Sequence, residues 1–383
     1  MHVLSFRPEF VLYLYLASCV AVLLFNVAYM FAEKFRSSRI FRRSEEMDAK
    51  VLEQVLRLKA GDPVEEVHYL YLKKKLRSLG GMRAFQMGME ELHREMEGQE
   101  ELLSRYQESL RDVFMDILPV YKKRDDVEQA YFAYMVSYLG LDTGQGNKDV
   151  LMDWLEELAV SDHAYSRENA LKALYAMGNE EALLRVWRLM EKRQIWHSRK
   201  LLADGLGSFR GDLLHLARSL WKLSLDYDPA LRLPIMQFIR FRVGQFDEEF
   251  YQILQDEKTD KEMRLEAIRY FRRYPYGPAK ELLMNFINYQ EFIDWEYASG
   301  AALSLGSYPG PDTVLCLKEG LRSHNWYVRL NCAETLVYEF GFTALQVADV
   351  RNGNDRYARE ILQAVWNQSQ LENQRMEIRK YDV

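Results

Sequence analysis

The sequence predicts an all-α protein in which one membrane-spanning helix precedes a right-handed α-solenoid of helical hairpins. Three observations support this fold class. Residues 10–32 form 23 consecutive positions without a charged side chain. In the rest of the chain, apolar residues recur with the 3.6-residue period of helices, and no alternating, strand-like run stands out. From about residue 122 an arginine-centred pattern returns every 30 to 34 residues, and such a fixed period is typical of solenoids.

The charge of the chain is unevenly distributed. Its 383 residues carry a net charge of −6, whereas residues 1–43 hold six Lys or Arg and only two acids, a net charge of +4. The remaining 340 residues therefore carry a net charge of −10. This acidic body argues against nucleic acid as a partner, because nucleic-acid binding rewards a basic surface.

Residues 10–32 have the length of a transmembrane helix. At ~1.5 Å per residue they reach about 34 Å, which exceeds the ~30 Å hydrocarbon core of a bilayer. The basic residues follow the apolar run, and the run is longer than that of a signal peptide, so we expect an anchor that is not cleaved. The positive-inside rule then places residues 1–9 outside as a short leader and the body of the chain in the cytoplasm.

A basic juxtamembrane segment, residues 33–43, contains five Lys or Arg and one acid. Two roles fit this segment. It determines the topology alone, or it also binds anionic headgroups, to which each charge near the surface contributes about 1 kcal/mol. We expect the chain to contact the lipid bilayer through residues 10–32 and 33–43.

Residues 44–121 predict a helical region that precedes the repeats. We expect breaks at the motifs AGDP (60–63) and LGGM (79–82), and a long acidic helix near 97–120. The apolar positions of this helix do not sustain three heptads. We therefore expect it to pack against the array rather than to form a coiled coil.

The repeat array extends over residues 122–366, before a polar tail at 367–383. Each copy has an Arg slot in one helix, called here the slot helix, and apolar or small residues at +3 and +7 from the slot. These two columns predict the buried face of the slot helix. Ala298 fills the slot of one copy, and the other slots hold Arg167, Arg199, Arg232, Arg264, Arg329 and Arg359. The +3 column is Ala170, Leu202, Ile235, Ala267, Ala301, Cys332 and Leu362, and the +7 column is Leu174, Leu206, Ile239, Phe271, Leu305, Leu336 and Trp366.

Start signals precede both helices of a hairpin. Asp or Asn stands four residues before the slot and favours a helix N-terminus, because its side chain accepts a hydrogen bond from a backbone N–H. This applies to Asp228, Asp260, Asp294, Asn325 and Asp355. The helix after each slot helix is expected to begin near Asn179, Asp212, Asp247, Pro278, Pro311 and Thr343.

The Asp/Asn-x-x-x-Arg cap and the two apolar columns resemble the second helix of HEAT repeats over residues 149–367, with a weaker hairpin at 97–140. The period is shorter than the ~40–47 residues of most HEAT and armadillo repeats and resembles the short bacterial variety. The signatures of tetratricopeptide and ankyrin repeats are absent. The resemblance implies an Asp–Arg ladder between neighbouring repeats. It would be made by Asp228, Asp260, Asn325 and Asp355 with Arg199, Arg232, Arg264, Arg329 and Arg359.

No catalytic, cofactor-binding or metal-binding motif emerges, so we expect no cofactor and no catalytic site. None of the seven His lies in an HExxH motif or pairs with a Cys. The glycine-rich stretch at 140–149 lacks the Gly-Lys-Ser/Thr of a phosphate-binding loop and predicts a connection between repeats. The three cysteines indicate free thiols, with a Cys316–Cys332 bridge as the alternative.

Positions +2, +5 and +9 of the slot helices should face away from the core, because +3 and +7 face into it. The +5 residue changes in chemistry from copy to copy, as expected of a partner-binding groove. Two neighbouring repeats also concentrate Arg and aromatic residues, which are enriched at interface hot spots. We predict a partner-binding surface on which Arg240 and Arg272 stack at +8; the alternative is a solvated basic face. Its residues are Arg240, Phe241, Arg242, Arg269, Arg272 and Arg273.

These expectations combine into a membrane-anchored cytoplasmic HEAT-repeat scaffold that binds and positions a partner protein at the inner membrane face. We expect a membrane-associated partner that is acidic where it meets the arginines, with anionic lipid as the alternative there. The expected setting is an envelope or exopolysaccharide assembly of a bacterium. The alternative function is an enzyme or enzyme-accessory factor, similar to lyase-like HEAT proteins, that uses the groove as a small-molecule site.

Thiol labelling tests the predicted topology. A cysteine introduced in residues 367–383 should resist a membrane-impermeant thiol reagent in intact cells and react after lysis, relative to the parent chain. Labelling without lysis would place the body outside and overturn the cytoplasmic assignment.

Overall fold

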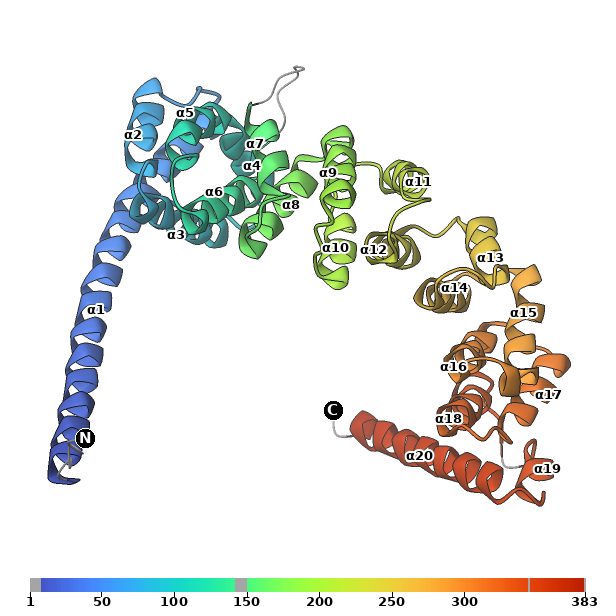
Figure 1. Cartoon of the computed structure of the whole chain (residues 1–383). Helices are drawn as coiled ribbons and strands as arrows, with labels where there is room; N and C mark the ends of the chain where they lie inside the picture. Colours follow the sequence, from blue (N-terminus) through green and yellow to red (C-terminus); the bar gives the residue numbers. More distant parts are fainter. Residues whose placement is uncertain (1–7, 142–149, 344, 382–383) are drawn as a thin grey trace, which may run out of the picture. The chain divides into compact units, whose positions relative to one another are not determined.

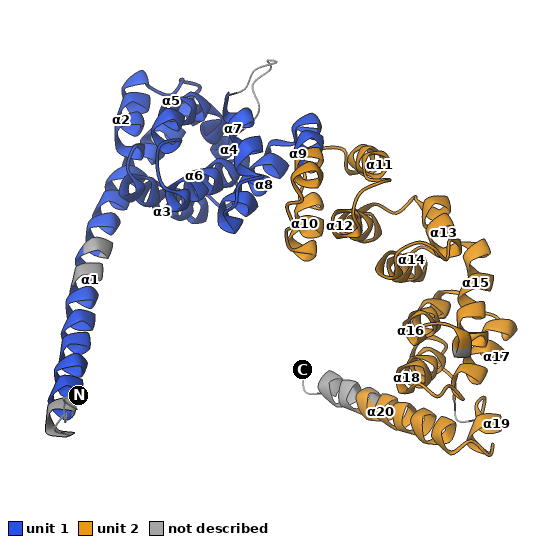
Figure 2. Cartoon of the chain, in the orientation of Figure 1, with its two compact units in different colours: residues 1–186 blue, residues 187–383 orange. Residues whose placement is uncertain are grey.

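The computed structural model describes residues 8–141, 150–343 and 345–381. Every regular element in these ranges is helical, as the sequence predicts (Figure 1). The chain divides into two compact units, residues 1–186 and 187–383 (Figure 2). Most of the expected leader at 1–9 and of the expected connection at 140–149 lies outside the described residues.

Unit 1 is built from eight helices and the first turns of a ninth, which crosses into unit 2. They are α1 (Pro8–Ala60), α2 (Glu66–Leu76), α3 (Leu79–Glu95), α4 (Glu100–Ser109), α5 (Arg111–Tyr121), α6 (Asp126–Leu139), α7 (Val150–Leu158), α8 (Ala164–Met177) and α9 (Glu180–Arg193).

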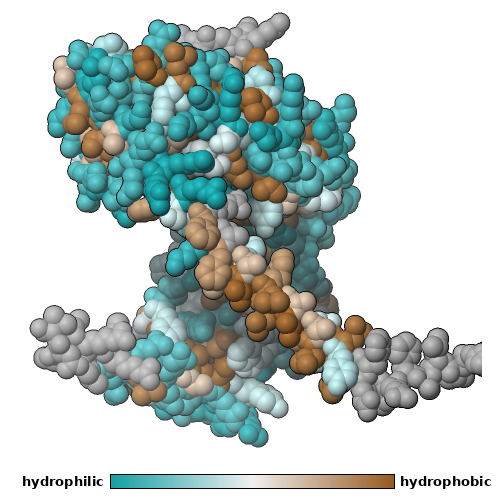
Figure 3. All heavy atoms as spheres, turned by 90° about the vertical axis from the view of Figure 1, so that its left-hand side faces the viewer, coloured by the Kyte–Doolittle hydropathy of each residue, from teal (hydrophilic) through white to brown (hydrophobic). Residues whose placement is uncertain are grey.

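A single helix, α1, connects the apolar N-terminal segment to the body of unit 1. Its residues Leu12–Phe31 are exposed, have a mean hydropathy of 2.0 and are long enough to span a membrane. Figure 3 shows the apolar side chains along this helix in brown. Further along, Met47, Val51 and Val55 are buried where α1 packs against α3. At ~1.5 Å per residue, Met47 lies about 24 Å from Phe31 along the helix axis. The apolar segment, the basic segment and the first helix of the body are therefore one continuous rod.

The two breaks predicted in the helical region have different outcomes. The break at 60–63 is confirmed by the gap between α1 and α2. The break predicted at 79–82 lies earlier, at 77–78 between α2 and α3, and residues 79–82 form the first turn of α3. Ser78 caps this turn by accepting a hydrogen bond from the backbone N–H of Gly81 (3.2 Å). A Cβ atom at Gly81 would lie 2.0 Å from the carbonyl oxygen of Lys75, so the glycine is needed for the close approach of two helix ends.

The long acidic helix expected near 97–120 is wrong, because two shorter helices, α4 and α5, occupy this range. Gly98 separates α3 from α4 with a φ of 85°, a left-handed value that favours glycine. A second bend at Leu110 separates α4 from α5. The two helices bury large side chains, among them Tyr106 and Phe114.

Helices α6 and α8 follow the packing rules of the repeats within unit 1. Asp125 caps α6 by accepting a hydrogen bond from a backbone N–H three residues later (2.9 Å). Phe132 and Val136 of α6 are fully buried, with the same spacing of four as the +3 and +7 columns. Asn169 of α8 donates its side-chain amide to the carbonyl of Ala130 in α6 (3.0 Å), so α8 is joined to α6, which precedes it by two helices.

Unit 2 continues from α9 with slot helices α10, α12, α14, α16, α18 and α20, which alternate with the helices between them. Its elements are α10 (Arg199–Leu206), α11 (Leu213–Leu223), α12 (Pro229–Phe238), η1 (Ile239–Val243), α13 (Asp247–Gln255), α14 (Lys261–Arg273), α15 (Gly277–Asn288), η2 (Gln290–Phe292), α16 (Trp295–Ser304), η3 (Leu305–Ser307), α17 (Pro311–Gly320), α18 (Trp326–Glu334), η4 (Thr335–Glu339), α19 (Ala348–Arg351) and α20 (Arg356–Tyr381). Elements η1 and η4 are π-helical turns, and η2 and η3 are 3₁₀ turns.

The two apolar columns form the core, as predicted. All seven +3 residues and six of the seven +7 residues are buried. The exception is Trp366, which is half-buried in α20. The slot helices of unit 2 pack in sequence order, with α10 on α12, α12 on α14, α14 on α16, α16 on α18 and α18 on α20.

Polar side chains join successive slot helices. Ser304 of α16 donates to the carbonyl of Ile268 in α14 (2.8 Å), and Thr335, directly after α18, donates to the carbonyl of Ala302 in α16 (2.9 Å). Asn331 of α18 donates to another backbone carbonyl of α16 (2.9 Å). Because a buried hydroxyl requires a hydrogen-bond partner, these bonds favour one register of each helix against the next.

The predicted helix starts hold with one exception. Helix α16 begins directly after Asp294 as predicted, but Asp294 makes no cap hydrogen bond, and its carboxylate pairs with Lys261 instead (3.0 Å). Thr343 does not start a helix, since α19 begins at Ala348. The described part of the tail predicted at 367–383 is helical, because α20 runs on to Tyr381. The slot helices capped as predicted are those that follow Asp228, Asp260, Asn325 and Asp355.

We expect Leu206→Asp to destabilise the fold strongly. Leu206 is fully buried in the +7 column, and an unpaired carboxylate there costs several kcal/mol. Lys200→Asp, at an exposed position of the same helix, is the matched control and should change the free energy of unfolding by less than about 0.5 kcal/mol. Denaturant unfolding of the full-length protein in detergent measures both values. Equal losses at the two positions would contradict the register of the repeats.

Candidate functional site

The six residues of the predicted binding surface lie at the ends of two slot helices that pack against each other, α12 and α14. Three of them lie in the π-helical turn η1, which continues α12: Arg240, Phe241 and Arg242. The other three lie towards the C-terminus of α14: Arg269, Arg272 and Arg273. The negative end of the helix dipole favours basic side chains at these positions.

The π-helical turn brings the two helix ends into contact. Directly after η1, Gly244 has a φ of 70°, in the left-handed region. A Cβ atom at Gly244 would lie 2.7 Å from the ring of Tyr274, the residue after α14. Glycine is therefore required here by its conformation and by the close approach of the ring. Single π-helical turns of this kind are frequent at functional sites.

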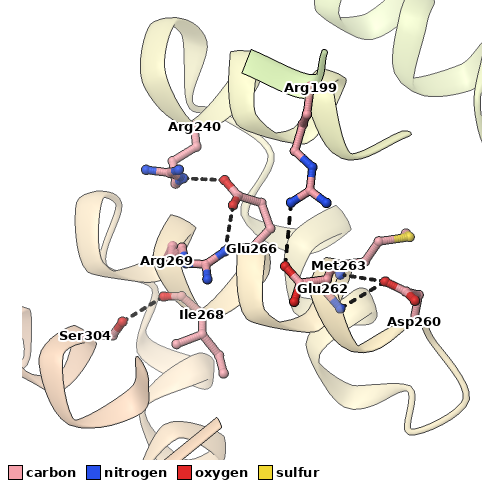
Figure 4. Close-up of polar contacts among 9 residues, drawn as sticks. All are labelled: Arg199, Arg240, Asp260, Glu262, Met263, Glu266, Ile268, Arg269 and Ser304. Atoms are coloured by element: carbon pink, nitrogen blue, oxygen red, sulfur yellow. Dashed lines mark hydrogen bonds and ion pairs between the residues drawn. The ribbon is translucent and has the colours of Figure 1, made fainter. Parts of the chain in front are cut away.

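A buried carboxylate, that of Glu266, organises the arginines. Glu266 in α14 has no exposed surface, and its two carboxylate oxygens accept hydrogen bonds from Arg240 and Arg269 (Figure 4). The contact with Arg269 measures 3.2 Å, and only 15% of the Arg240 side chain is exposed. Two guanidiniums thus compensate the burial of one carboxylate. Arg240 therefore joins the end of α12 to α14, and Arg269 neutralises the same carboxylate from within α14.

The predicted stacking of Arg240 on Arg272 is replaced by contacts with two different carboxylates. Arg240 forms an ion pair with Glu266, whereas Arg272 donates a hydrogen bond to Glu339 of η4 (3.1 Å). The second contact links α14 to the turn that follows α18. The two arginines join repeats through acids that lie between them rather than through each other.

Five of the six residues are exposed, and three of them contact no glutamate within the described ranges: Phe241, Arg242 and Arg273. Phe241 is 48% exposed, and the Arg240 guanidinium lies 3.9 Å from its ring centroid. Arg242 is exposed next to Gly207, at the end of α10. Arg273 is exposed with its guanidinium 5.9 Å from the ring centroid of Tyr274. Within the described ranges, neither Arg242 nor Arg273 forms an ion pair.

A cleft of about 360 Å³ lies beside these arginines, between α14, α16 and α18. Its charged groups are engaged in pairs; Glu262, for example, pairs with Arg199 (3.6 Å; Figure 4). The cleft can therefore recognise a ligand through its shape and its aromatic wall. The side chains that line it include Glu262, Arg269, Arg272, Trp295 and Leu303.

The Asp–Arg ladder implied by the resemblance to HEAT repeats is not what the described residues show. The slot arginines donate instead to backbone carbonyls at or just beyond the end of the preceding helix, at 3.1 Å for Arg232, 3.2 Å for Arg264 and 3.2 Å for Arg329. Basic side chains commonly satisfy the last carbonyls of a helix in this way. Burial lowers the pKa of Arg232. Arg199 pairs with a glutamate of α14, and Arg359 is exposed on α20.

Sequence reasoning missed the acids of the site. Glu266 holds a +2 position, which was expected to face away from the core, but it is fully buried. Asn331 holds the same position in its repeat and bonds to the preceding slot helix. A polar residue directly before an apolar +3 residue was the available signal, because this side of the helix faces the previous repeat. The +5 column behaves as predicted, with no buried member.

The buried cysteines show no sign of a reactive thiol. Cys316 and Cys332 are buried free thiols. Burial raises the pKa of Cys316 to about 12, so this thiol stays protonated at neutral pH. Within residues 8–141, 150–343 and 345–381, no group of three or more His, Cys, Asp or Glu could hold a metal ion.

Comparison of the sequence with models of known protein families and with curated proteins finds no match. The paired charges, the exposed aromatic ring and the two accessible guanidiniums together have the chemistry of a binding surface.

We expect Arg240→Ser to lower stability, although the residue lies on a polar surface. Removing one partner of a buried ion pair typically costs about 3–5 kcal/mol. Here the loss should fall at the lower end, because Arg269 still serves Glu266. Arg273→Ser is the control, since it removes a guanidinium without an ion pair and should cost less than about 0.5 kcal/mol. Denaturant unfolding in detergent compares the two variants, and equal stabilities would show that Glu266 does not depend on Arg240.

Proposed function

We propose that this protein is a membrane-anchored scaffold that binds a partner protein and holds it at the cytoplasmic face of a bacterial membrane. Residues 10–32 would cross the bilayer once, with the N-terminus outside and both units inside. The charge asymmetry supports this orientation, because five Lys or Arg follow the apolar segment within residues 33–43 and only Arg7 precedes it.

In this proposal the hairpins form a right-handed α-solenoid of the HEAT type. The period of 30 to 34 residues and the two buried columns support this architecture. It is also supported by the packing of each slot helix of unit 2 on the next and by the hydrogen bonds between them. Each repeat of such an array contacts mainly its neighbours, and the slot helices together present an extended surface to a partner.

One observation carries the binding function: an exposed Phe241 lies among arginines on a surface where the core is already supplied by the +3 and +7 columns. Aromatic and Arg side chains concentrate binding energy in interfaces. The adjacent cleft of about 360 Å³ adds a recess that a partner side chain can enter. The carboxylates that face these arginines are engaged in ion pairs, which favours recognition over acid–base catalysis.

The continuity of α1 supports a scaffolding role. A helix without a break would hold unit 1 at a set height, about 24 Å from the end of the apolar segment to the first buried turn. Basic residues of 33–43 would lie at the membrane surface, where they attract anionic headgroups. The proposed partner is itself a membrane component, such as a member of an envelope or exopolysaccharide assembly.

Site-specific photo-crosslinking in intact cells tests the proposal. A crosslinking amino acid at Leu303, in the wall of the cleft, should yield one discrete adduct with a membrane-associated protein. The same group at Lys258, exposed on the loop between α13 and α14, is the control and should yield none. Absence of any adduct from Leu303, combined with a small molecule bound to the purified protein, would contradict the scaffold and favour a ligand-binding role.

A further inference from the structure

We infer that a patch of three residues, Phe241, Arg242 and Arg273, receives an acidic segment of the partner protein. In this arrangement two carboxylates of the segment meet the two guanidiniums, and an apolar side chain between them meets the ring. The inference rests on the proposed binding function of this face and adds the chemistry of the partner.

The patch contains the two arginines of this surface that form no ion pair with another described residue. Three of the five arginines on the surface are engaged with glutamates of α14 and η4. Arg242 and Arg273 are exposed and, among the residues that the structure describes, have no carboxylate partner. A guanidinium presents its donors as a planar fork that matches a carboxylate with two hydrogen bonds. Two free guanidiniums therefore fit two carboxylates.

The three residues lie at or next to one junction, where the end of η1 meets the end of α14. Gly244 lies so close to the Tyr274 ring that a Cβ atom would be 2.7 Å from it, and this contact joins the end of η1 to the end of α14. Phe241 and Arg242 stand three and two positions before Gly244. Arg273 lies over the same tyrosine ring on the other side of the junction, 5.9 Å from its centroid.

Phe241 is held in place before a partner arrives. Its ring is 48% exposed, and the guanidinium of Arg240 lies 3.9 Å from its centroid. Arg240 is itself fixed by the buried Glu266. A ring that is already ordered loses little conformational entropy on binding, so it is suited to anchor an apolar side chain.

The surrounding charge favours an acidic segment. Residues 187–273 contain seventeen Lys or Arg and thirteen Asp or Glu, whereas the whole chain has a net charge of −6. An acidic segment is therefore attracted to this region and disfavoured by the rest of the body, which is acidic. An anionic membrane fits the patch less well, because recognition of lipid surfaces takes roughly 4–8 clustered basic residues. The five basic residues of 33–43 provide such a cluster next to the apolar segment.

The test uses the full-length protein in detergent and a short fluorescein-labelled peptide in which glutamates flank a single leucine. Fluorescence anisotropy measures its binding. We expect the peptide to bind more tightly than an analogue with glutamine in place of glutamate, and salt to weaken the binding. The double variant Arg242→Gln/Arg273→Gln should weaken it at least about tenfold, because two charge-assisted contacts are lost. Its melting temperature should stay close to that of the wild type, since neither arginine pairs with an acid in the part of the chain that the structure describes.

Two further variants separate the patch from general electrostatics. Lys192→Gln/Arg193→Gln removes two exposed charges from the last turn of α9 and should change the affinity by no more than about twofold. Phe241→Ala should weaken binding of the leucine peptide and leave a peptide with alanine in its place nearly unaffected.

Two outcomes would overturn the inference. Equal losses in the two double variants would mean that net charge alone attracts the peptide. Displacement of the peptide by short-chain phosphatidylglycerol more readily than by unlabelled peptide would make the patch a lipid contact. The crosslinking at Leu303 separates this failure from that of the proposed function. An adduct at Leu303, together with peptide binding that does not depend on Arg242 and Arg273, would contradict only the partner chemistry. Absence of the adduct, together with a small molecule bound to the purified protein, would contradict the scaffold.

Discussion

The burial of Glu266 between α12 and α14 sets the geometry of the surface around it. A carboxylate without solvent contact is costly unless positive groups surround it, and here Arg240 and Arg269 supply them. Because Arg240 comes from the end of α12, the ion pair fixes the end of one slot helix against the middle of the next. The position of Phe241 follows from this contact, since its ring lies next to the immobilised guanidinium. The same interaction that stabilises two repeats therefore shapes their outer surface.

Hydrogen bonds from side chains to backbone carbonyls also fix one helix against another elsewhere in the chain. Ser304, Thr335 and Asn331 each donate to a backbone carbonyl of the preceding slot helix, and Asn169 does so within unit 1. Apolar columns alone allow neighbouring helices to slide, because dispersion contacts are not directional. A buried donor left without its acceptor costs about 1–3 kcal/mol, so each of these bonds penalises a shifted register. The polar residues at the repeat contacts thus specify the stacking that the apolar columns drive.

The features predicted from the sequence are those that obey local rules. The +3 and +7 columns follow from the helical period, and the caps at Asp228, Asp260 and Asp355 follow from hydrogen bonds to N–H groups two or three residues away. The ion pair of Glu266 could not be predicted in this way, because its partner Arg240 lies 26 positions earlier and the contact exists only after two repeats have packed.

Glycine and arginine were the residue types most easily misinterpreted. Gly81 suggests a helix break, yet it lies inside the first turn of α3, where glycine is required because the backbone of Lys75 approaches it closely. Gly98, with its left-handed φ, separates α3 from α4, and a bend at Leu110 divides the stretch whose composition predicts one long helix. The slot arginines were expected to reach neighbouring repeats, but carbonyls at the end of the preceding helix lie nearer and attract them. In these cases the role of the residue depends on which backbone groups lie next to it in the folded chain, and the sequence alone does not show those neighbours.

A double-mutant cycle between Arg240 and Glu266 tests the central claim, that one buried ion pair fixes α12 on α14 and with it the accessible surface. Arg240→Met, Glu266→Met and the double variant are compared with the wild type by denaturant unfolding of the full-length protein in detergent. Each single variant should have a free energy of unfolding more than about 2 kcal/mol below that of the wild type. Arg240→Met leaves the buried carboxylate with one partner fewer, and Glu266→Met leaves two guanidiniums without their acid. The double variant should recover at least about half of the summed loss. Losses that simply add would show that the two side chains stabilise the protein independently and would contradict the account.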